Sequence, residues 1–164
     1  MSTPEPDLHP NLVELAPLLG TWSGQGRGVY PTITAFDYHE TVVFGHVGKP
    51  FFTYRQTTRA VVDDRPLHAE VGYLRVPRPG TVEWIVAHPT GITEIEAGDY
   101  AVADAVITMA LQATAIGLSP SAKEVRELNR SLRIDGDVLS YTVGMGAVGQ
   151  PEQNHLRAVL HRQR

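Results

Sequence analysis

Gly20-Thr-Trp-Ser-Gly-Gln-Gly26 stands between an apolar, helix-like segment and a long series of strand-like segments. A P-loop would end in Gly-Lys-Ser/Thr, and a dinucleotide fingerprint would need Gly-x-Gly-x-x-Gly between a strand and a helix. Here Gly24, Gly26 and Gly28 alternate, so they share one face of an extended chain, where another backbone can approach closely. Trp22 follows the same alternation and would cap one end of a core. The stretch predicts the first strand of a small closed β-barrel; the alternative is a glycine-rich hairpin with a buried Trp.

Helical signal is limited to two short segments. Residues 10–16 form an apolar segment that Pro17 is expected to end. The second candidate is a helical turn over 119–124, with Ser119 as its N-cap and Pro120 as its first residue. The sequence therefore predicts one short N-terminal helix and one isolated turn.

The rest of the chain consists of strand-like segments bounded by Gly, Pro or Asp. Asp135-Gly136-Asp137 is a strong hairpin turn, and 77–80 and 88–91 are weaker ones. The connections are too short for helical crossovers, so the sheet is antiparallel. The expected strands span 22–30, 33–44, 51–62, 67–76, 82–87, 91–97, 100–106, 107–114, 125–134, 138–147 and 155–162.

About ten consecutive strands without a linker or repeat predict an all-β, antiparallel up-and-down barrel, because closure removes the sheet edges. The chain is expected to form a single domain over residues 1–164, with 1–9 flexible. A barrel of more than about eight strands leaves room for a ligand inside.

Composition narrows the classes of partner. The chain has 164 residues, a formal net charge of -4 and a pI near 5.9. This acidic balance, with scattered Lys and Arg, argues against nucleic acid as a partner. No apolar run is long enough to span a membrane, and the polar N-terminus does not resemble a signal peptide. The absence of cysteine excludes disulfides and thiol catalysis and favours a cytoplasmic location. A homo-oligomer stays open.

Histidine is the main candidate for chemistry. No His pair has the spacing of a zinc protease, and no serine lies in a Gly-x-Ser-x-Gly elbow. In the last strand, Leu156, Ala158 and Leu160 share the aliphatic face that should point inward. Alternation alone would therefore turn His155 outward, as an ordinary solvated histidine. This reverses only if His155 lies at the barrel mouth or if a β-bulge changes the parity.

The chain resembles the nitrobindin family, all-β haem proteins, over nearly its whole length. The resemblance rests on four motifs in order, and their closeness indicates a mycobacterial member. They are Leu15-Ala-Pro-Leu-Leu-Gly-Thr-Trp-Ser-Gly-Gln-Gly26, the run from Phe36-Asp-Tyr-His to Val47-Gly-Lys-Pro50, His68-Ala-Glu-Val-Gly-Tyr-Leu-Arg75 and Asn154-His155-Leu156.

The resemblance implies a ten-stranded, lipocalin-like barrel that holds one haem b per chain near an open end. It implies His155 as the axial ligand of the iron, with the opposite coordination position open to a small ligand. It also implies reversible binding of nitric oxide and isomerisation of peroxynitrite to nitrate by the ferric protein. The motif residues Gly20, Trp22, Gly24 and Gly26 are expected to shape the fold rather than bind iron.

Three further haem contacts are expected. His68 could lie on the distal side or at the haem edge, with a hydrogen-bonded strand histidine as the alternative. Thr41 could contact the haem, or could simply be a strand-favouring residue. Lys123, like its neighbour Arg126, could pair with the haem propionates, or could be a solvated surface charge.

A second function fits the same barrel. It could carry a fatty acid or another apolar small molecule, as fatty-acid-binding proteins do. Such a carrier would place an inward Arg and Tyr near its end to hold a carboxylate; Arg157 keeps this reading open, although the last strand has no Tyr. His155 in its motif favours haem.

Overall fold

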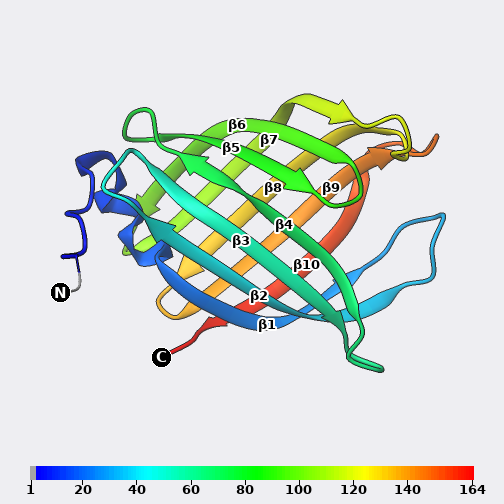
Figure 1. Cartoon of the computed structure of the whole chain (residues 1–164), viewed down its shortest axis with the longest axis horizontal. Helices are drawn as coiled ribbons and strands as arrows, with labels where there is room; N and C mark the ends of the chain where they lie inside the picture. Colours follow the sequence, from blue (N-terminus) through cyan, green and yellow to red (C-terminus); the bar gives the residue numbers. More distant parts are fainter. Residues whose placement is uncertain (1–2) are drawn as a thin grey trace.

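The computed structural model describes residues 3–164 as a closed barrel of ten antiparallel strands. Each strand pairs with its neighbours along the chain, and β1 pairs with β10 (Figure 1). The predicted all-β up-and-down barrel is therefore confirmed. The strands are β1 (Gly20–Gly28), β2 (Phe36–His46), β3 (Phe51–Ala60), β4 (Pro66–Arg75), β5 (Thr81–His88), β6 (Ile92–Ala103), β7 (Val106–Leu118), β8 (Val125–Asp135), β9 (Val138–Ala147) and β10 (Gln153–Arg162).

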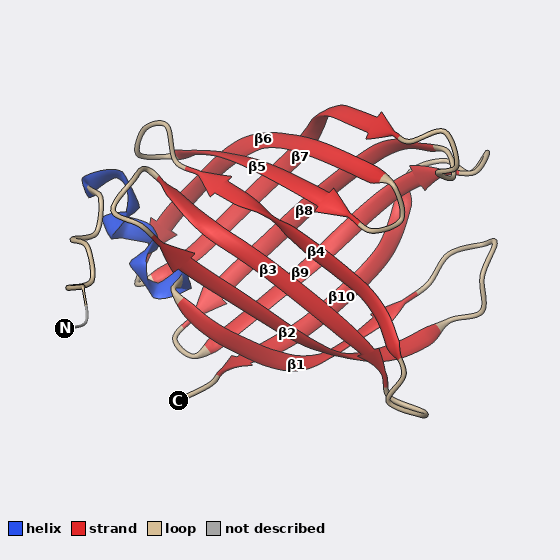
Figure 2. Cartoon of the chain, in the orientation of Figure 1, coloured by secondary structure: helices blue, strands red, loops and turns tan. Residues whose placement is uncertain are grey.

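One helix, η1 (Pro10–Leu18), covers one end of the barrel (Figure 2). It is a 3₁₀ helix with His9 as its N-cap. Nδ1 of His9 accepts a hydrogen bond from the N–H of Asn11 at 3.1 Å. It runs past Ala16, where the sequence predicted its end, because Pro17 has no N–H that would need an acceptor and the N–H of Leu19 donates to the carbonyl of Ala16. Three fully buried leucines fix it to the barrel: Leu12, Leu15 and Leu18. We call this the helix end and the opposite one the far end.

The predicted strands 91–97 and 100–106 are one continuous strand, β6. In the sequence, Gly98 has the pattern of a turn residue. In the structure it lies opposite Leu111 of β7, where an added Cβ would be 1.8 Å from the carbonyl oxygen of Ala110. Glycine is needed there for close strand approach and not for a turn. The true turn is formed by Asp104 and Ala105, both with positive φ.

Two other expectations concern the loops. The isolated turn predicted over 119–124 is confirmed, since the N–H of Ala122 donates to the carbonyl of Ser119 at 3.0 Å. At the N-terminus, Leu8 packs against the core, so part of the segment expected to be flexible makes tertiary contacts. Residues 1 and 2 of that segment lie outside the described residues. No helix within 3–164 is long and apolar enough to cross a membrane.

The Gly-x-Trp motif shapes β1 as expected. Trp22 is fully buried at the helix end, where its indole N–H donates to the carbonyl of Leu18 at 2.9 Å. At Gly24 an added Cβ would lie 2.1 Å from the backbone oxygen of Val159 on β10. Gly24 thus allows β1 to approach β10 closely, whereas Gly26 and Gly28 leave room for the rings of Tyr38 and Phe36 on β2.

The barrel interior has three layers. A large apolar cluster fills the helix end, and a smaller one occupies the far end. Between them lies a layer of buried polar side chains, which we call the polar layer and which consists of Glu40, Gln56, Glu70, Glu94, Glu96 and Arg130. The room predicted inside the barrel is thus largely taken by side chains, and the far end becomes the natural place for a large ligand.

Candidate functional site

His155 lies at the far end in a β-bulge of β10. The register between β10 and β9 shifts between Asn154 and Leu156, which leaves His155 as the extra residue. Beyond the bulge the predicted alternation holds, since Ala158 and Leu160 are buried. His155 therefore lies both at the mouth of the barrel and in a β-bulge, which are the two conditions under which strand alternation does not turn it outward.

One hydrogen bond selects the tautomer of His155. Its Nδ1 lies 3.0 Å from the carbonyl oxygen of Val29, and a carbonyl can only accept, so Nδ1 carries the hydrogen and Nε2 keeps its lone pair. Burial lowers the pKa of His155 below its ordinary 6.5, although the hydrogen bond to Val29 acts in the opposite direction. At neutral pH the side chain is therefore a neutral imidazole with a free Nε2, the form that binds metals.

The surroundings of His155 are apolar. Its ring packs edge-on against Tyr30, with the ring centroids 5.4 Å apart. The hydroxyl of Tyr30 accepts a hydrogen bond from the N–H of Ala147 at 2.8 Å and thereby ties the end of β1 to β9. Tyr30 belongs to the far-end cluster, whose members are Tyr30, Val125, Leu128, Val143 and Ala147, packed against Ile92, Ala113, Ile116, Tyr141, Met145 and Leu156. A neutral imidazole and an apolar wall thus lie side by side.

His68 also lies at the far end, on β4, and its side chain is partly buried. Its Nε2 is 3.0 Å from Nδ1 of His88, and the two rings are stacked with centroids 5.2 Å apart. Burial is the largest cause that lowers the pKa of His68 below 6.5, and it outweighs the opposing charge of Glu70. His68 is thus a neutral, hydrogen-bonded strand histidine at the correct end of the barrel.

Lys123 and Thr41 differ in position. Lys123 is exposed in the β7–β8 connection, two residues before Val125 of the far-end cluster, so it lies at the rim of the far end. Thr41 is exposed on the outer face of β2, where its hydroxyl lies 3.3 Å from that of Ser23 on β1. The even-numbered neighbour Glu40 points inward instead. The position of Thr41 does not fit a haem contact, and we leave it out of the site.

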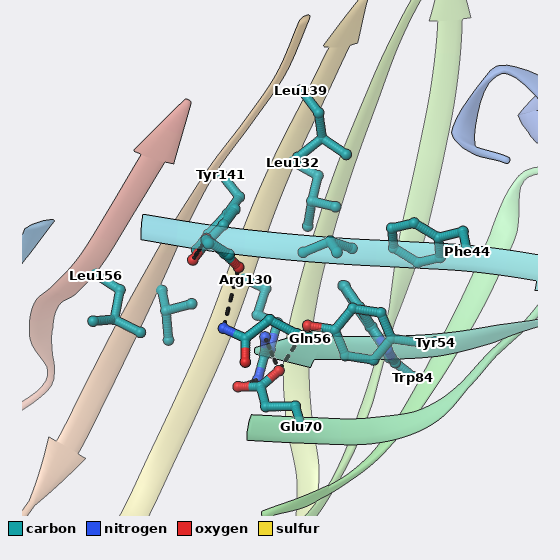
Figure 3. Close-up of a pocket in the computed structure, with 13 residues that line it drawn as sticks. Phe44, Tyr54, Gln56, Glu70, Trp84, Arg130, Leu132, Leu139, Tyr141 and Leu156 are labelled. Carbon is teal, nitrogen blue, oxygen red and sulfur yellow. Dashed lines mark hydrogen bonds and ion pairs between the residues drawn. The ribbon is translucent and has the colours of Figure 1, made fainter. Parts of the chain in front are cut away.

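Arg130 is the centre of the polar layer (Figure 3). Its guanidinium spans both oxygens of Glu70 at 3.2 and 3.3 Å, forms a short contact with Glu94 and lies 3.6 Å from Glu96. The same guanidinium stacks over the ring of Trp84, 5.2 Å from its centroid. The positive charge of the buried Arg130 is therefore balanced by carboxylates inside the barrel.

The four buried carboxyl groups differ in protonation. Burial opposes the ionisation of Glu70, but Arg130, His88 and the Tyr54 hydroxyl together outweigh it and lower its pKa to about 2. Burial raises the pKa of Glu96 to about 8 and that of Glu40 to about 7, although Arg130 opposes the shift of Glu96 and a hydrogen bond from Tyr141 opposes that of Glu40. Glu70 is ionised and Glu96 is largely protonated at neutral pH.

A narrow cavity runs beside this layer toward Leu156 on β10 (Figure 3). Tyr141 donates a hydrogen bond to Glu40 at 2.6 Å, and Gln56 donates to the other oxygen of Glu40 at 3.1 Å. These pairs lie between the apolar helix end and His155. The cavity therefore ends at the far-end cluster.

The polar layer and Tyr30 were not predicted from the sequence as parts of the site. Strand parity could have revealed Arg130, which occupies the inward position between Leu128 and Leu132, and Glu70, which shares its face with Leu74. Strand parity could also have placed Tyr30 on the inward face with Trp22, but its contact with β9 exists only in the closed barrel.

A comparison with family models matches residues 11–162 to the THAP4-like, heme-binding beta-barrel domain. The chain is 66% identical over 158 residues to peroxynitrite isomerase 1 of Mycolicibacterium paratuberculosis, with 96% of this chain and 98% of that protein covered. It is 63% identical over 161 residues to peroxynitrite isomerase 1 of Mycobacterium tuberculosis (strain H37Rv), with 96% and 98% covered.

Among solved structures, the crystal structure of Rv2717c from M. tuberculosis is similar to this chain. The TM-score is 0.95 and the sequence identity 63%, and the match covers 96% of this chain and 100% of that one. The barrel and the order of its strands are therefore shared over nearly the whole chain.

Proposed function

The chain belongs to the THAP4-like haem-binding β-barrel family, and from this premise we propose that it is a peroxynitrite isomerase whose haem is held by Nε2 of His155 at the far end of the barrel. Peroxynitrite and nitrate are isomers, so the reaction needs no second substrate. We propose one haem b per chain and reversible binding of nitric oxide at the same open position.

The single observation that supports this best is the tautomer of His155. A haem ligand must be a neutral imidazole with one free nitrogen, and the hydrogen bond to Val29 provides it. The neighbouring wall of Tyr30, Val143 and Met145 is apolar, as the face of a porphyrin requires. The donor and its surroundings on this chain thus fit a haem.

Haem iron, when bound, supplies a Lewis-acidic centre at which the O–O bond of peroxynitrite can break. The residues of the chain have three roles around this group. His155, fixed by Val29 and Tyr30, sets where the group lies. The apolar far-end cluster would exclude water from the space beside the bound group. We propose that Lys123, which is exposed in the β7–β8 connection, pairs with a propionate.

The carrier alternative is disfavoured by the polar layer. A fatty-acid carrier needs an inward Arg free to bind the ligand carboxylate, but the inward Arg130 is already paired with Glu70 and Glu94. Arg157, which kept the carrier reading open, is exposed on the outer face of β10. The interior offers a carboxylate ligand no free cation at this layer.

The test is the decay of peroxynitrite by stopped flow, with haem-loaded, haem-free and cyanide-treated protein compared. We expect faster decay and a higher nitrate yield only with the haem-loaded protein, and less nitration of free tyrosine in the same solution. Cyanide should abolish the effect because it occupies the open coordination position. Equal decay rates in the three samples would contradict the proposal.

A further inference from the structure

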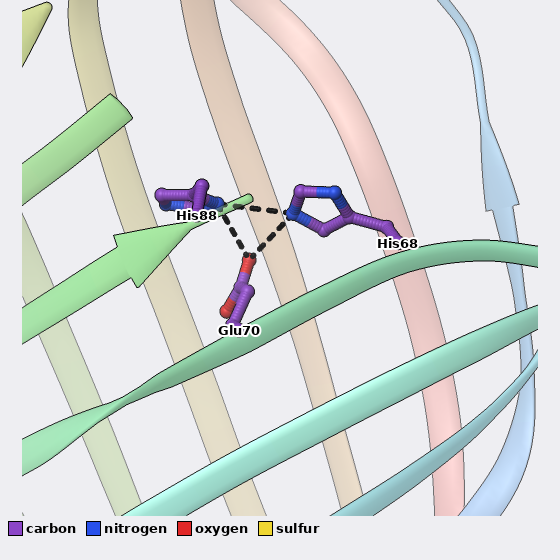
Figure 4. A group of neighbouring side chains, drawn as sticks. All are labelled: His68, Glu70 and His88. Atoms are coloured by element: carbon purple, nitrogen blue, oxygen red, sulfur yellow. Dashed lines mark hydrogen bonds and ion pairs between the residues drawn. The ribbon is translucent and has the colours of Figure 1, made fainter. Parts of the chain in front are cut away.

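Three potential metal ligands converge at the far end, on strands away from β10. His68 and Glu70 come from β4, and His88 is the last residue of β5 (Figure 4). Nε2 of His68 is 3.0 Å from Nδ1 of His88, and Oε1 of Glu70 is 3.8 Å from the former and 3.6 Å from the latter. All three ligand atoms thus point at one small volume.

These separations match those around a divalent ion. Ligand atoms at about 2.0–2.2 Å from a tetrahedral ion lie about 3.3–3.6 Å from one another. The distances among the three atoms bracket this range, so an ion could enter with shifts of only a few tenths of an ångström. Two imidazoles and one carboxylate also form a ligand set that zinc uses in proteins, with a fourth position left open.

The outer partners of the ligands are also in place. Nε2 of His88 is buried without a hydrogen-bond partner and lies 3.6 Å from Oε1 of Glu94. A carboxylate on the far nitrogen of a ligating histidine directs the lone pair of the other nitrogen toward the metal. Oε2 of Glu70 is held by Tyr54 at 2.8 Å and by Arg130 at 3.2 Å, whereas Oε1 accepts one hydrogen bond from Arg130 at 3.3 Å and keeps a second lone pair for the site.

Charge favours a cation here. The carboxylates of Glu70 and Glu94 both contact the guanidinium of Arg130. Arg130 supplies one positive charge against these two carboxylates. A surface hollow lined by Thr58, His68 and Pro89 offers an entry path.

We propose that His68, His88 and Glu70 form a binding site for one divalent transition-metal ion of the zinc type, separate from the haem site at His155. Glu94 positions His88, and Arg130 with Tyr54 positions Glu70.

The experiment is a titration of the full chain with Zn²⁺ against a chromogenic chelator, on both haem-loaded and haem-free protein. We expect one tight Zn²⁺ per chain in both forms. Co²⁺ bound to the haem-free chain should show the visible bands of low-coordinate cobalt. Zn²⁺ should also raise the midpoint of thermal unfolding.

The variants locate the ion. His88→Ala and His68→Ala should each weaken Zn²⁺ binding at least about tenfold and remove the thermal shift. The matched controls are His39→Ala and His161→Ala, both exposed histidines, which should bind as the wild type does. His155→Ala should lose haem but keep Zn²⁺, so that failure of the haem proposal and failure of this one are separate results.

Two results would overturn the proposal. The first is no Zn²⁺ binding tighter than that of a generic surface histidine, which would make the three side chains a hydrogen-bonded cluster only. The second is binding that is unchanged in His88→Ala and His68→Ala while circular dichroism shows that both variants are folded.

Discussion

At the scale of single residues, the half-buried His155 and the buried Arg130 have opposite properties. His155 keeps one ring nitrogen free because the other is bonded to a backbone carbonyl, so it is available to a ligand from outside. Arg130 is fully paired with carboxylates and is available to none. The first is suited to binding, whereas the second holds strands β4, β6 and β8 together across the interior.

Replacing the proposed haem ligand should abolish tight haem binding. His155→Ala removes the only imidazole proposed to bind the iron, and we expect haem affinity to fall at least about a hundredfold. The measurement is a haem titration followed at the Soret band. His161→Ala, an exposed histidine on the same strand, is the control and should bind normally. Equal affinity in the two variants would place the haem elsewhere.

Removing the central cation should destabilise the fold. Arg130→Met leaves Glu70 and Glu94 buried without their counter-ion, and breaking such a pair costs about 3–5 kcal/mol. Urea unfolding of the haem-free chain measures this loss. Arg157→Met on the outer face of β10 should change the free energy of unfolding by no more than about 0.5 kcal/mol. A similarly small effect at Arg130 would mean that the network adds little stability.

At the scale of elements, β1 and β10 control closure of the barrel. β1 is glycine-rich on its inward face, which lets β10 come close, while the bulge in β10 frees His155 from the alternation of its strand. The same pair of strands thus closes the sheet and presents the candidate ligand.

A methyl group on the inward face of β1 should disturb this closure. In Gly24→Ala the new Cβ would lie 2.1 Å from the backbone oxygen of Val159, so the strands must separate, at a cost of about 1–3 kcal/mol. Thermal unfolding measures it. Ser23→Ala, on the outer face of the same strand, is the matched control and should have a small effect. A neutral Gly24→Ala would show that β1 and β10 are not tightly packed at this point.

At the scale of the whole molecule, the interior is a stack of apolar, polar and apolar layers. The helix end supplies the main core, the polar layer holds four carboxyl groups around one guanidinium, and the far end holds His155 and the proposed metal ligands. Stability should therefore depend on pH through groups in the middle of the barrel.

Stability should fall as the pH rises from about 6.5 to 8. Burial raises the pKa of Glu96 from 4.5 to about 8, so in this window the folded state keeps a proton that the unfolded state has lost. The loss is about 1.4 kcal/mol per pH unit, or about 2 kcal/mol over the window. Below pH 6.5 the neutral histidines His68 and His155 act in the opposite direction.

Urea unfolding at several pH values, with Zn²⁺ and haem absent, checks this. Glu96→Gln mimics the protonated side chain, so its stability should change less steeply with pH above 6.5 than that of the wild type. Asp99→Asn, an exposed residue on the same strand, is the control and should keep the wild-type slope. Parallel curves for Glu96→Gln and the wild type would show that Glu96 ionises normally in the folded chain.

Local pattern was enough to predict the barrel. Alternation, turn residues and short connections are properties of a few neighbouring residues. Trp22 with Gly24 and Gly26 predicted the first strand of a closed barrel. The same local reasoning misread Gly98, because a glycine that lets two strands approach looks like a glycine that makes a turn.

Only the closed barrel decided which side chains meet. Glu70, Glu94 and Arg130 lie far apart in the chain, and they meet because the strand register brings three inward positions to one level. Strand alternation alone predicts that His155 points outward. In the structure, a bulge in the pairing of β10 with β9 changes its position. Register and bulges arise from packing of the whole sheet, which no single strand encodes, so the residues of the site could be nominated from the sequence but their meeting could not.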